Sequence, residues 1–514
     1  MQRTKNAVRN AKSGMFLKFY QMFGQFILRT VMIYTLGMEY LGLSSLFTSI
    51  LQVLNLAELG VGSAMVYSMY KPIVDNDSKT ICALLNLYKK YYRIIGFVIL
   101  FLGLIVMPFL PKLISGDIPE SMNLYVLYFL NLITIVLSYW LFAYKNSILN
   151  AHQRLDIINK ISIASITIQY ILQIIVLFVF KNYYLFLLIA LVAQILLNIF
   201  TSIVVNRYYP KYKAKGELSS KEKNKINIRI KGLVTSKIGE VTINSADSIV
   251  ISIFLGLNML AIYNNYYYII SAIMGLTNII FTSTIAGIGN SLIVDGKEKN
   301  YNDLLKFTFM VSWIACFCST AILCLIQPFM IAWVGEGNLL SLECVICFVI
   351  FFYMRVMNQL WVSYKDAAGI WDKDKYRPLL TAIFNLILNL ILVHYIGIYG
   401  IILSTVISLL LMGSPWLLIN LFKYVLERKL NNYLLIILKY VLVTIISCAI
   451  SFAVCHYATA NINIYLSIIL SGIICLIIPN VIYILIFNKS KEYAYVKDLI
   501  NSILKRRIQD EKSN

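Results

Sequence analysis

The sequence predicts an all-α membrane protein of about fourteen transmembrane helices, and three observations support this fold class. Sixty per cent of the 514 residues are apolar or aromatic and only 13% are charged, whereas soluble proteins carry about 25% charged residues. The mean hydropathy is +0.76. The apolar residues form long runs, and the basic residues gather in the short segments between them. So little polar material cannot cover a water-soluble protein of this size, and the remaining surface must face lipid.

A helix needs about 20 mostly apolar residues to cross the hydrocarbon core of a bilayer. Fourteen runs meet this requirement, although charges interrupt several of them. They lie near 14–36, 44–70, 91–111, 122–144, 158–180, 183–206, 233–256, 260–290, 305–333, 342–362, 378–396, 400–422, 433–456 and 463–487. The first run continues into a long span with no small-x-small site after it, so we expect no cleavable signal peptide.

The distribution of basic residues predicts the orientation of these spans. An even number of spans places both termini on one side, and 40 of the 45 Lys and Arg residues fall on that side. Only Lys112 and Lys181 fall on the other. Because basic loops stay in the cytoplasm, both termini are predicted to be cytoplasmic. The net charge of +21 therefore reflects membrane topology, and we expect no nucleic-acid partner.

An internal repeat with an offset of 219–220 residues predicts two six-helix lobes. Matching segments fall at equivalent points of spans 1–6 and 7–12; they are Gly37 with Gly256, Leu41 with Leu260, 73–75 with 293–295, and 144–145 with 364–365. Two such copies in one orientation are related by an axis along the membrane normal. We predict lobes at 1–206 and 233–426 around a central cavity, a basic cytoplasmic linker at 207–232, extra helices at 427–488 and a basic tail at 489–514. This architecture is typical of transporters.

Two polar ridges occupy the first helix of each predicted lobe. The first ridge consists of Lys18, Gln21, Gln25 and Arg29, and the second of Lys237, Glu240, Asn244 and Asp247 with Ser248. Steps of three and four residues place each set on one helical face. Charges inside a span cost about 2.5–3.5 kcal/mol each on insertion scales, so they normally face protein or a wet cavity. We expect both ridges to face the cavity; the alternative is that each packs within its own lobe.

Further polar groups inside spans are expected to line the same cavity. Amides suit sugar hydroxyls, whereas arginine suits a diphosphate, and hydrogen bonds between helices are an equally good explanation for any single amide. The additional candidates are Asn55, Arg355, Asn358, Gln359, Asn385 and Asn389.

Three carboxylates inside spans, Glu58, Glu240 and Asp247, are candidate coupling groups. A partly desolvated carboxylate can exchange a proton or bind Na⁺. The three could equally be ion-pair partners of Arg29 or Lys237, and both interpretations stay open.

No metal site or cofactor is expected. Nearly all of the nine cysteines fall within apolar runs, where they read as small packing residues. Cys344 and Cys347 form a CxxC, but no histidine lies close in sequence to complete a zinc site. No Gly-rich phosphate loop occurs, which argues against ATP as the energy source. The basic segments 145–154 and 365–377 could gather anionic membrane lipids, or could serve topology alone.

Two stretches resemble a known family. YLGLSSLFTSILQVLNLAELGVGSAMVYSMYKPI at 40–73 is similar to the second-helix region of bacterial polysaccharide flippases, and YKDAAGIWDKDKYRPLLTAIFNLILNLILV at 364–393 is similar to their span 10–11 loop. These are Wzx-type exporters of the multidrug/oligosaccharidyl-lipid/polysaccharide superfamily. The resemblance implies transport of an undecaprenyl-diphosphate-linked oligosaccharide between the leaflets of the bacterial cytoplasmic membrane, for surface polysaccharide biosynthesis with other assembly proteins. It also implies that cavity cations receive the diphosphate; the matching positions are Arg29, Lys18, Lys237 and Arg355.

Other functions agree less well with the sequence. A cation-coupled multidrug exporter of the related multidrug and toxin extrusion group would be better served by an acidic cleft without Arg29. A peptidoglycan-precursor flippase is a close variant. A membrane glycosyltransferase or polymerase is disfavoured because no long outer loop is available for catalytic groups, so we expect no enzymatic activity.

Overall fold

The computed structural model describes residues 2–58, 60–116, 122–498 and 501, and within these ranges it is helical with no β-strand. Side chains are described for all of these residues except those at 2–8, 57, 231–238, 240, 242–244, 280, 282, 283 and 286. The chain forms two compact units, Met1–Asn264 and Asn265–Asn514. The predicted all-α membrane fold is therefore confirmed.

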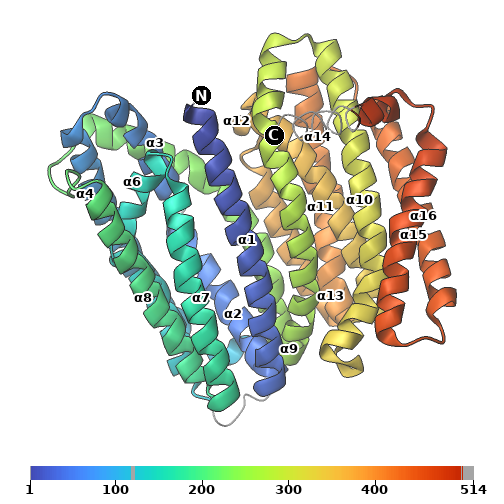
Figure 1. The fold of residues 1–514 in the computed structure, drawn as a ribbon, viewed down its shortest axis with the longest axis horizontal. Helices are drawn as coiled ribbons and strands as arrows, with labels where there is room; N and C mark the ends of the chain where they lie inside the picture. The colour runs from blue at the N-terminus through green and yellow to red at the C-terminus, as the bar shows by residue number, and fades with distance from the viewer. Residues whose placement is uncertain (1, 59, 117–121, 499–500, 502–514) are drawn as a thin grey trace, which may run out of the picture. The chain divides into compact units, whose positions relative to one another are not determined.

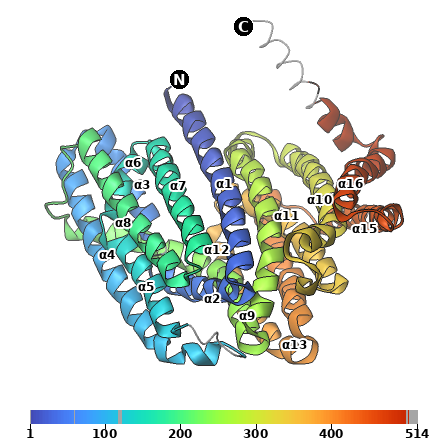
Figure 2. The same ribbon diagram turned by 60° about the horizontal axis from the view of Figure 1, so that its bottom comes forward.

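In the first unit α7 packs between α1 and α8, while α5 packs between α4 and α8 (Figures 1 and 2). The elements of this unit are α1 (Gln2–Thr35), α2 (Met38–Leu54), η1 (Asn55–Glu58), α3 (Val61–Val74), α4 (Ser78–Val106), η2 (Met107–Leu113), α5 (Leu124–Trp140), η3 (Ala143–Lys145), α6 (Asn146–Ala151), α7 (Leu155–Val179), α8 (Tyr183–Tyr208) and the first part of α9 (Ser220–Val294).

In the second unit α10 contacts α11, α15 and α16, and the α15–α16 pair forms a hairpin at the end of the chain (Figure 1). After α9 the elements are α10 (Lys297–Val334), η4 (Glu336–Asn338), α11 (Leu342–Ala368), α12 (Trp371–Asp374), α13 (Arg377–Ser408), η5 (Leu409–Gly413), α14 (Ser414–Leu421), η6 (Phe422–Leu426), α15 (Asn431–Thr459) and α16 (Ile464–Phe487). The predicted extra helices at 427–488 correspond to α15 and α16.

Nine helices in the described ranges are long and apolar enough to cross a membrane, or ten if the bent pair of α5 with 143–151 counts as one span. This number is lower than the fourteen predicted runs for local reasons. Two predicted spans join in each of the kinked helices α9 and α13, whose breaks fall at Gly256 and at 396–397. The predicted span 14–36 lies in α1, which is not among the nine, and the predicted span 44–70 is divided into α2, η1 and α3. The chain is thus a multi-pass membrane protein.

The two copies of the sequence repeat have the same local structure at matched positions. Gly37 precedes α2 with a φ of 107°, and Gly256 interrupts α9 with a φ of 83°. A positive φ is readily adopted only by glycine. Likewise α3 ends at Val74 and α9 ends at Val294, 220 residues apart. The matches identified in the sequence therefore mark equivalent turns in the fold.

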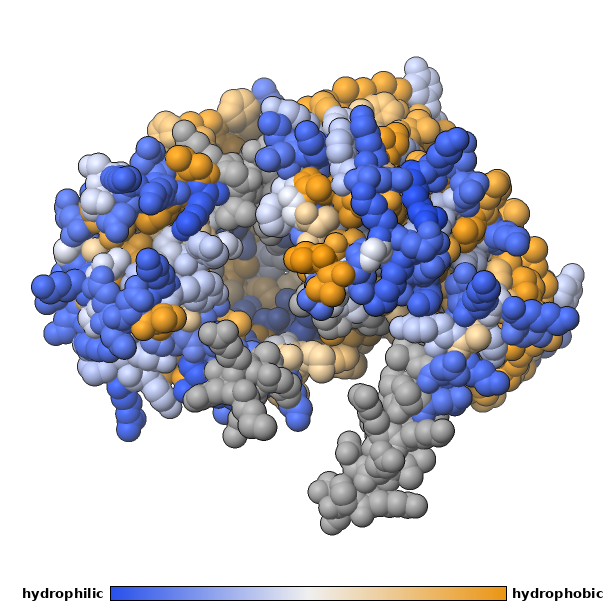
Figure 3. Space-filling model, turned by 90° about the horizontal axis from the view of Figure 1, so that it is seen from above, coloured by the Kyte–Doolittle hydropathy of each residue, from blue (hydrophilic) through white to orange (hydrophobic). Residues whose placement is uncertain are grey.

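The division between the two units falls inside α9, whereas the lobes were expected to meet at the basic linker 207–232. The second half of that linker, from Ser220, is already helical and forms the beginning of α9. The predicted lobe boundaries remain a prediction. The face bearing the N-terminal end of α1 is mostly hydrophilic (Figure 3), as expected for the side where the basic segments gather.

Candidate functional site

Helix α1 packs against α7 along one face. Ser13 accepts a hydrogen bond from Asn159 at 3.0 Å, and the hydroxyls of Tyr20 and Thr167 lie 2.6 Å apart. One turn further on, Gly24 leaves room for the ring of Tyr170, because a Cβ at this position would lie 2.2 Å from that ring. At 100° per residue these positions share one side of the helix.

The predicted polar ridge lies on a different face of α1. Lys18 and Gln25 are exposed, while Gln21 and Arg29 are half-buried. By helical spacing the ridge is centred about a third of a turn away from the face that packs on α7. The first ridge is therefore separate from the face that packs on α7, and its expected position at the cavity remains a prediction.

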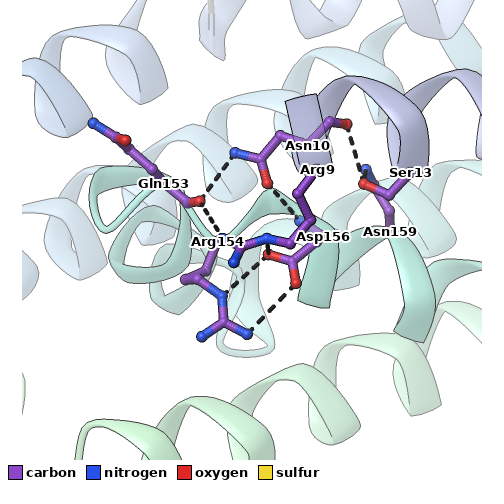
Figure 4. Close-up of polar contacts among 7 residues, drawn as sticks. All are labelled: Arg9, Asn10, Ser13, Gln153, Arg154, Asp156 and Asn159. Atoms are coloured by element: carbon purple, nitrogen blue, oxygen red, sulfur yellow. Dashed lines mark hydrogen bonds and ion pairs between the residues drawn. The ribbon is translucent and has the colours of Figure 1, made fainter. Parts of the chain in front are cut away.

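The predicted cytoplasmic end of α1 is fastened to the start of α7 by a charged cluster (Figure 4). The carboxylate of Asp156 is buried and pairs with Arg9 at 3.2 Å and Arg154 at 3.1 Å. Asn10 donates to the carbonyl of Gln153 at 2.9 Å and accepts from the backbone N–H of Asp156 at 3.2 Å. This cluster fixes one end of α1 and leaves its polar ridge on the adjacent face.

The second predicted span is broken where two of the candidate residues lie. Asn55 and Glu58 form the short 3₁₀ segment η1, and Gly60 follows in the left-handed conformation with a φ of 84°. The hydroxyl of Tyr92 donates to Glu58 Oε1 at 3.2 Å, and Tyr139 donates to Asn55 Oδ1 at 3.3 Å. The break thus presents a carboxylate and an amide to a group of tyrosines.

The tyrosines around this break also contact one another within the first unit. The hydroxyl of Tyr88 donates to that of Tyr92 at 2.6 Å, and the ring of Tyr139 stacks edge-on against Tyr92 at 5.1 Å. A Cβ on Gly62 would lie 3.0 Å from the Tyr88 hydroxyl and 3.2 Å from Glu58 Oε1. Glycine at this position therefore allows the carboxylate and the hydroxyls to approach one another. The sequence pattern identified Glu58 but gave no signal for these tyrosines, which come from α4 and α5.

Next to the break lies a cavity of about 230 Å³. Amides and hydroxyls make up much of its wall: it is lined by Thr48, Leu51, Gln52, Asn55, Asn131, Thr134, Ile135, Leu187 and Ala190. Gln52 also accepts a hydrogen bond from Ser245 of α9 at 3.3 Å. A wall of neutral hydrogen-bonding groups suits hydroxylated ligands better than purely apolar ones.

The second predicted ridge is described only in part. The side chains of Lys237, Glu240 and Asn244 lie outside the described residues, so their expected roles stay predictions. Asp247 is buried and accepts a hydrogen bond from the hydroxyl of Tyr263 at 3.3 Å. This carboxylate lies in the first unit together with the beginning of α9.

Three further candidates lie on α11 in the second unit. The guanidinium of Arg355 lies 5.9 Å from the ring centre of Phe351. Asn358 is buried and donates to the hydroxyl of Ser414 at 3.1 Å, and Gln359 is half-buried. The Asn358 contact holds α11 to α14, which is the structural explanation considered for any single amide.

Asn385 and Asn389 are fully buried around the kink in α13. Asn385 donates to the hydroxyl of Thr405 at 3.1 Å, and Asn389 bonds to Ser404. The chain turns sharply at Gly397, and a Cβ on Gly400 would lie 2.6 Å from the carbonyl oxygen of Leu392. These amides hold the two halves of α13 together, and a cavity-lining role for them remains a prediction.

The cysteines are arranged in a way that sequence spacing did not show. Cys344 and Cys347 are buried in α11, in agreement with a packing role. Three others, Cys324, Cys455 and Cys475, come from three different helices and place their sulfur atoms within 4.8 Å of one another. They are separated by up to 151 positions in the chain, so no motif could have identified them.

Comparison with known proteins shows which fold this is. No protein-family model and no curated protein matches the sequence. Among solved structures, the lipid II flippase MurJ in an inward closed conformation is similar over 94% of this chain and 99% of its own, with a TM-score of 0.68 and 16% identity. A MATE transporter of Vibrio cholerae is similar over 80% of this chain and 96% of its own (TM-score 0.56, 15% identity). A eukaryotic MATE transporter is similar over 79% and 93% (TM-score 0.58, 12% identity).

Proposed function

We propose that this protein is a flippase for undecaprenyl-diphosphate-linked oligosaccharides, acting by alternating access in the bacterial cytoplasmic membrane with both termini in the cytoplasm. The premise is a fold shared with a lipid II flippase over nearly the full length of both chains. At 16% identity this likeness concerns the fold, so the substrate must be argued from the residues of this chain.

The observation that carries the proposal is the polar face of α1. Lys18 and Gln25 are exposed on α1, a helix that the sequence predicts to cross the membrane, and the α7-packing face lies elsewhere. Charged side chains inside a span are costly where they face lipid, so these groups are better explained by a wet, substrate-accessible surface. Lysine and arginine suit phosphate groups, because charge-assisted hydrogen bonds to phosphate oxygens are strong.

The polar side chains that line the cavity beside η1 suit a glycan. The cavity beside η1 offers amides and hydroxyls from Gln52, Asn55, Asn131 and Thr134. Its volume of about 230 Å³ falls below the ~300–1,000 Å³ of typical ligand pockets, which suits one sugar unit better than a whole substrate. A cavity wall of neutral hydrogen-bonding groups can favour hydroxylated ligands over apolar ones, whether or not the ligand carries a charge.

The test is made in the native bacterium with the gene depleted. Undecaprenyl-linked glycans are extracted and identified by mass spectrometry, with complementation by wild type, by Arg29→Ala or by Lys12→Ala. Lys12 is an exposed lysine of the same helix that lies off the ridge, so its variant is the matched control. We expect a defined oligosaccharide-diphosphate lipid to accumulate about tenfold, and wild type and Lys12→Ala to relieve the accumulation while Arg29→Ala does not.

Other outcomes would identify a different function. Unchanged lipid-linked glycans with intact surface polysaccharide would contradict the proposal and favour a cation-coupled multidrug exporter. Accumulation of a peptidoglycan precursor alone would assign the lipid II-type cargo instead. Loss of a glycan, rather than accumulation of its precursor, would indicate a glycosyltransferase or polymerase.

A further inference from the structure

We propose that the three cysteines joining the C-terminal hairpin to α10 bind a soft monovalent metal ion, Cu(I), through their sulfur atoms. Cys324 lies on α10, Cys455 on α15 and Cys475 on α16. All three side chains are almost completely buried, with 5%, 5% and 1% of their surfaces exposed. The three helices contact one another pairwise, so the thiols meet where one helix of the lobe and both helices of the hairpin converge.

The spacing of the sulfurs fits a shared ion. Three sulfurs at about 2.3 Å from a central ion in a trigonal arrangement lie about 4 Å apart. The three Sγ atoms here already lie within 4.8 Å of one another. Closing the remaining distance requires side-chain adjustments of less than about 1 Å, without movement of the helices.

The ligand set selects the class of metal. All ligand atoms of this group are sulfur, and no histidine or carboxylate belongs to it within the described part of the chain. Thiolates favour soft ions such as Cu(I). Structural zinc sites are almost always tetrahedral with four protein ligands, and this group offers three. Calcium and magnesium prefer oxygen ligands, so they do not fit.

Apolar side chains surround the group and shield a bound ion from competing ligands. The half-buried side chains packed around it, Ala321, Phe452 and Ile474, are apolar and limit access of water. Cys475 donates weakly to the carbonyl of Thr320, with a separation of 3.8 Å. Each sulfur that binds as a thiolate gives up its proton to solvent, no electron is transferred, and the S–Cu(I) bonds replace this weak interaction.

The consequence of binding would be mechanical. A single ion held by α10, α15 and α16 would connect the hairpin to α10 beside the apolar contacts of Ala321, Phe452 and Ile474. Because a ligand that binds only the folded state stabilises it according to its concentration and affinity, Cu(I) should raise the midpoint of thermal unfolding. This inference is independent of the substrate proposed above.

The test uses the full chain, purified in detergent under anaerobic, reducing conditions. Cu(I) is supplied as its acetonitrile complex and competed with bicinchoninate. We expect one Cu(I) per chain with only sulfur scatterers near ~2.3 Å in X-ray absorption. The triple variant Cys324→Ser/Cys455→Ser/Cys475→Ser should bind at least 100-fold more weakly, and the control Cys344→Ser/Cys347→Ser should bind as wild type.

A second measurement does not depend on the folding of any variant. Wild-type protein is alkylated under partly denaturing conditions, with and without Cu(I). The modified cysteines are then identified by mass spectrometry. We expect protection of Cys324, Cys455 and Cys475 and no change at Cys82. No protection at these three positions, binding of Zn(II) in preference to Cu(I), or a disulfide between any two of them in native membranes would each overturn the proposal.

Discussion

The second spans of the two sequence repeats begin alike and then differ. Each starts after a glycine with positive φ, Gly37 in one copy and Gly256 in the other, and each copy ends at a valine, Val74 or Val294. Between these points the second copy is one uninterrupted helix. The first copy is broken by the 3₁₀ turn 55–58 and by the left-handed Gly60. A broken helix frees backbone polar groups, and in a membrane these are tolerated where protein or a wet cavity satisfies them.

The break in the first copy indicates where the two halves of the duplicated fold differ in function. The break places Asn55 beside a polar cavity and Glu58 beside the hydroxyl of Tyr92. The position of the second copy that matches Glu58 is Asn278, and it lies on continuous helix. Breaks of this kind are where transporters of other folds place substrate and ion sites. We therefore expect function to depend on the break far more than on its counterpart.

The largest effect is expected from Glu58→Gln. This change removes the negative charge and keeps a hydrogen-bond acceptor for Tyr92, so the local fold should survive. If the carboxylate exchanges a proton or binds Na⁺, transport should fall at least tenfold and lose its dependence on the ion gradient. Accumulation of the lipid-linked glycan in depleted cells measures the loss, and flux into vesicles with an imposed gradient measures the coupling.

The matched control for that experiment is Asn278→Ala, in the unbroken copy. It should leave transport within about twofold of wild type. Equal losses in both variants would remove the functional distinction between the two spans. Unchanged transport in Glu58→Gln, with gradient dependence intact, would make Glu58 a structural partner of the tyrosines.

A second comparison concerns the carboxylates at the start of α7 and before α13. Asp156 pairs with Arg9 and Arg154, whose side chains are 39% and 32% exposed. Asp374 pairs with Arg377 at 2.6 Å and Lys365 at 3.5 Å, whose side chains are only 10% and 11% exposed. Both carboxylates are buried, but water can reach only the cations of the first cluster.

This difference predicts unequal costs for the same substitution. Asp374→Ala leaves the buried guanidinium of Arg377 without its partner, whereas Lys365 keeps its ion pair with Asp366 at 2.9 Å. The uncompensated buried charge should lower the free energy of unfolding by about 3–5 kcal/mol. Asp156→Ala leaves its arginines in contact with water and should cost only about 1–2 kcal/mol. Denaturation of both variants in mixed micelles provides the measurement. Equal costs would show that burial of the cations does not control the energetics here.

Much of this comparison was visible in the sequence. The repeat offset of 219–220 matched Gly37 with Gly256. The apolar runs predicted spans 378–396 and 400–422, which meet near the observed kink at 396–397. Periodicity succeeds there because long apolar runs and helix-breaking glycines act locally. The helix count differs where local signals compete, as at η1. The run 44–70 is apolar on average, and its few Asn, Glu and Gly residues interrupt too few positions to predict a break.

Contacts between distant segments could not be predicted. The tyrosines that surround Glu58 come from α4 and α5, and the cysteine group joins residues on three helices. These juxtapositions depend on how helices pack, and no spacing along one helix encodes them. The polar ridge of α1 was predictable for the opposite reason, because a stripe at helical period is a property of a single element.

The smallest expected effect, and the sharpest comparison of the two repeats, concerns the paired glycines themselves. Alanine at either position must adopt a positive φ, which costs roughly 1–2 kcal/mol for a residue with a Cβ. At Gly37 nothing lies within 4 Å of the new Cβ, so this conformational cost should be the whole effect. At Gly256 the Cβ would lie 2.8 Å from the carbonyl oxygen of Ser115, so the backbone around it must also move.

We therefore expect Gly256→Ala to lower the free energy of unfolding by about 1–3 kcal/mol more than Gly37→Ala, the range typical of an added methyl group in a tightly packed site. Parallel denaturation of the two variants isolates this difference, because their shared conformational cost cancels. The adjoining contact should resist displacement, since the N–H of Ser115 donates to the carbonyl of Ser252 at 2.9 Å. If the two variants lose the same stability, the segment carrying Ser115 yields freely, and the second glycine is required only for its φ.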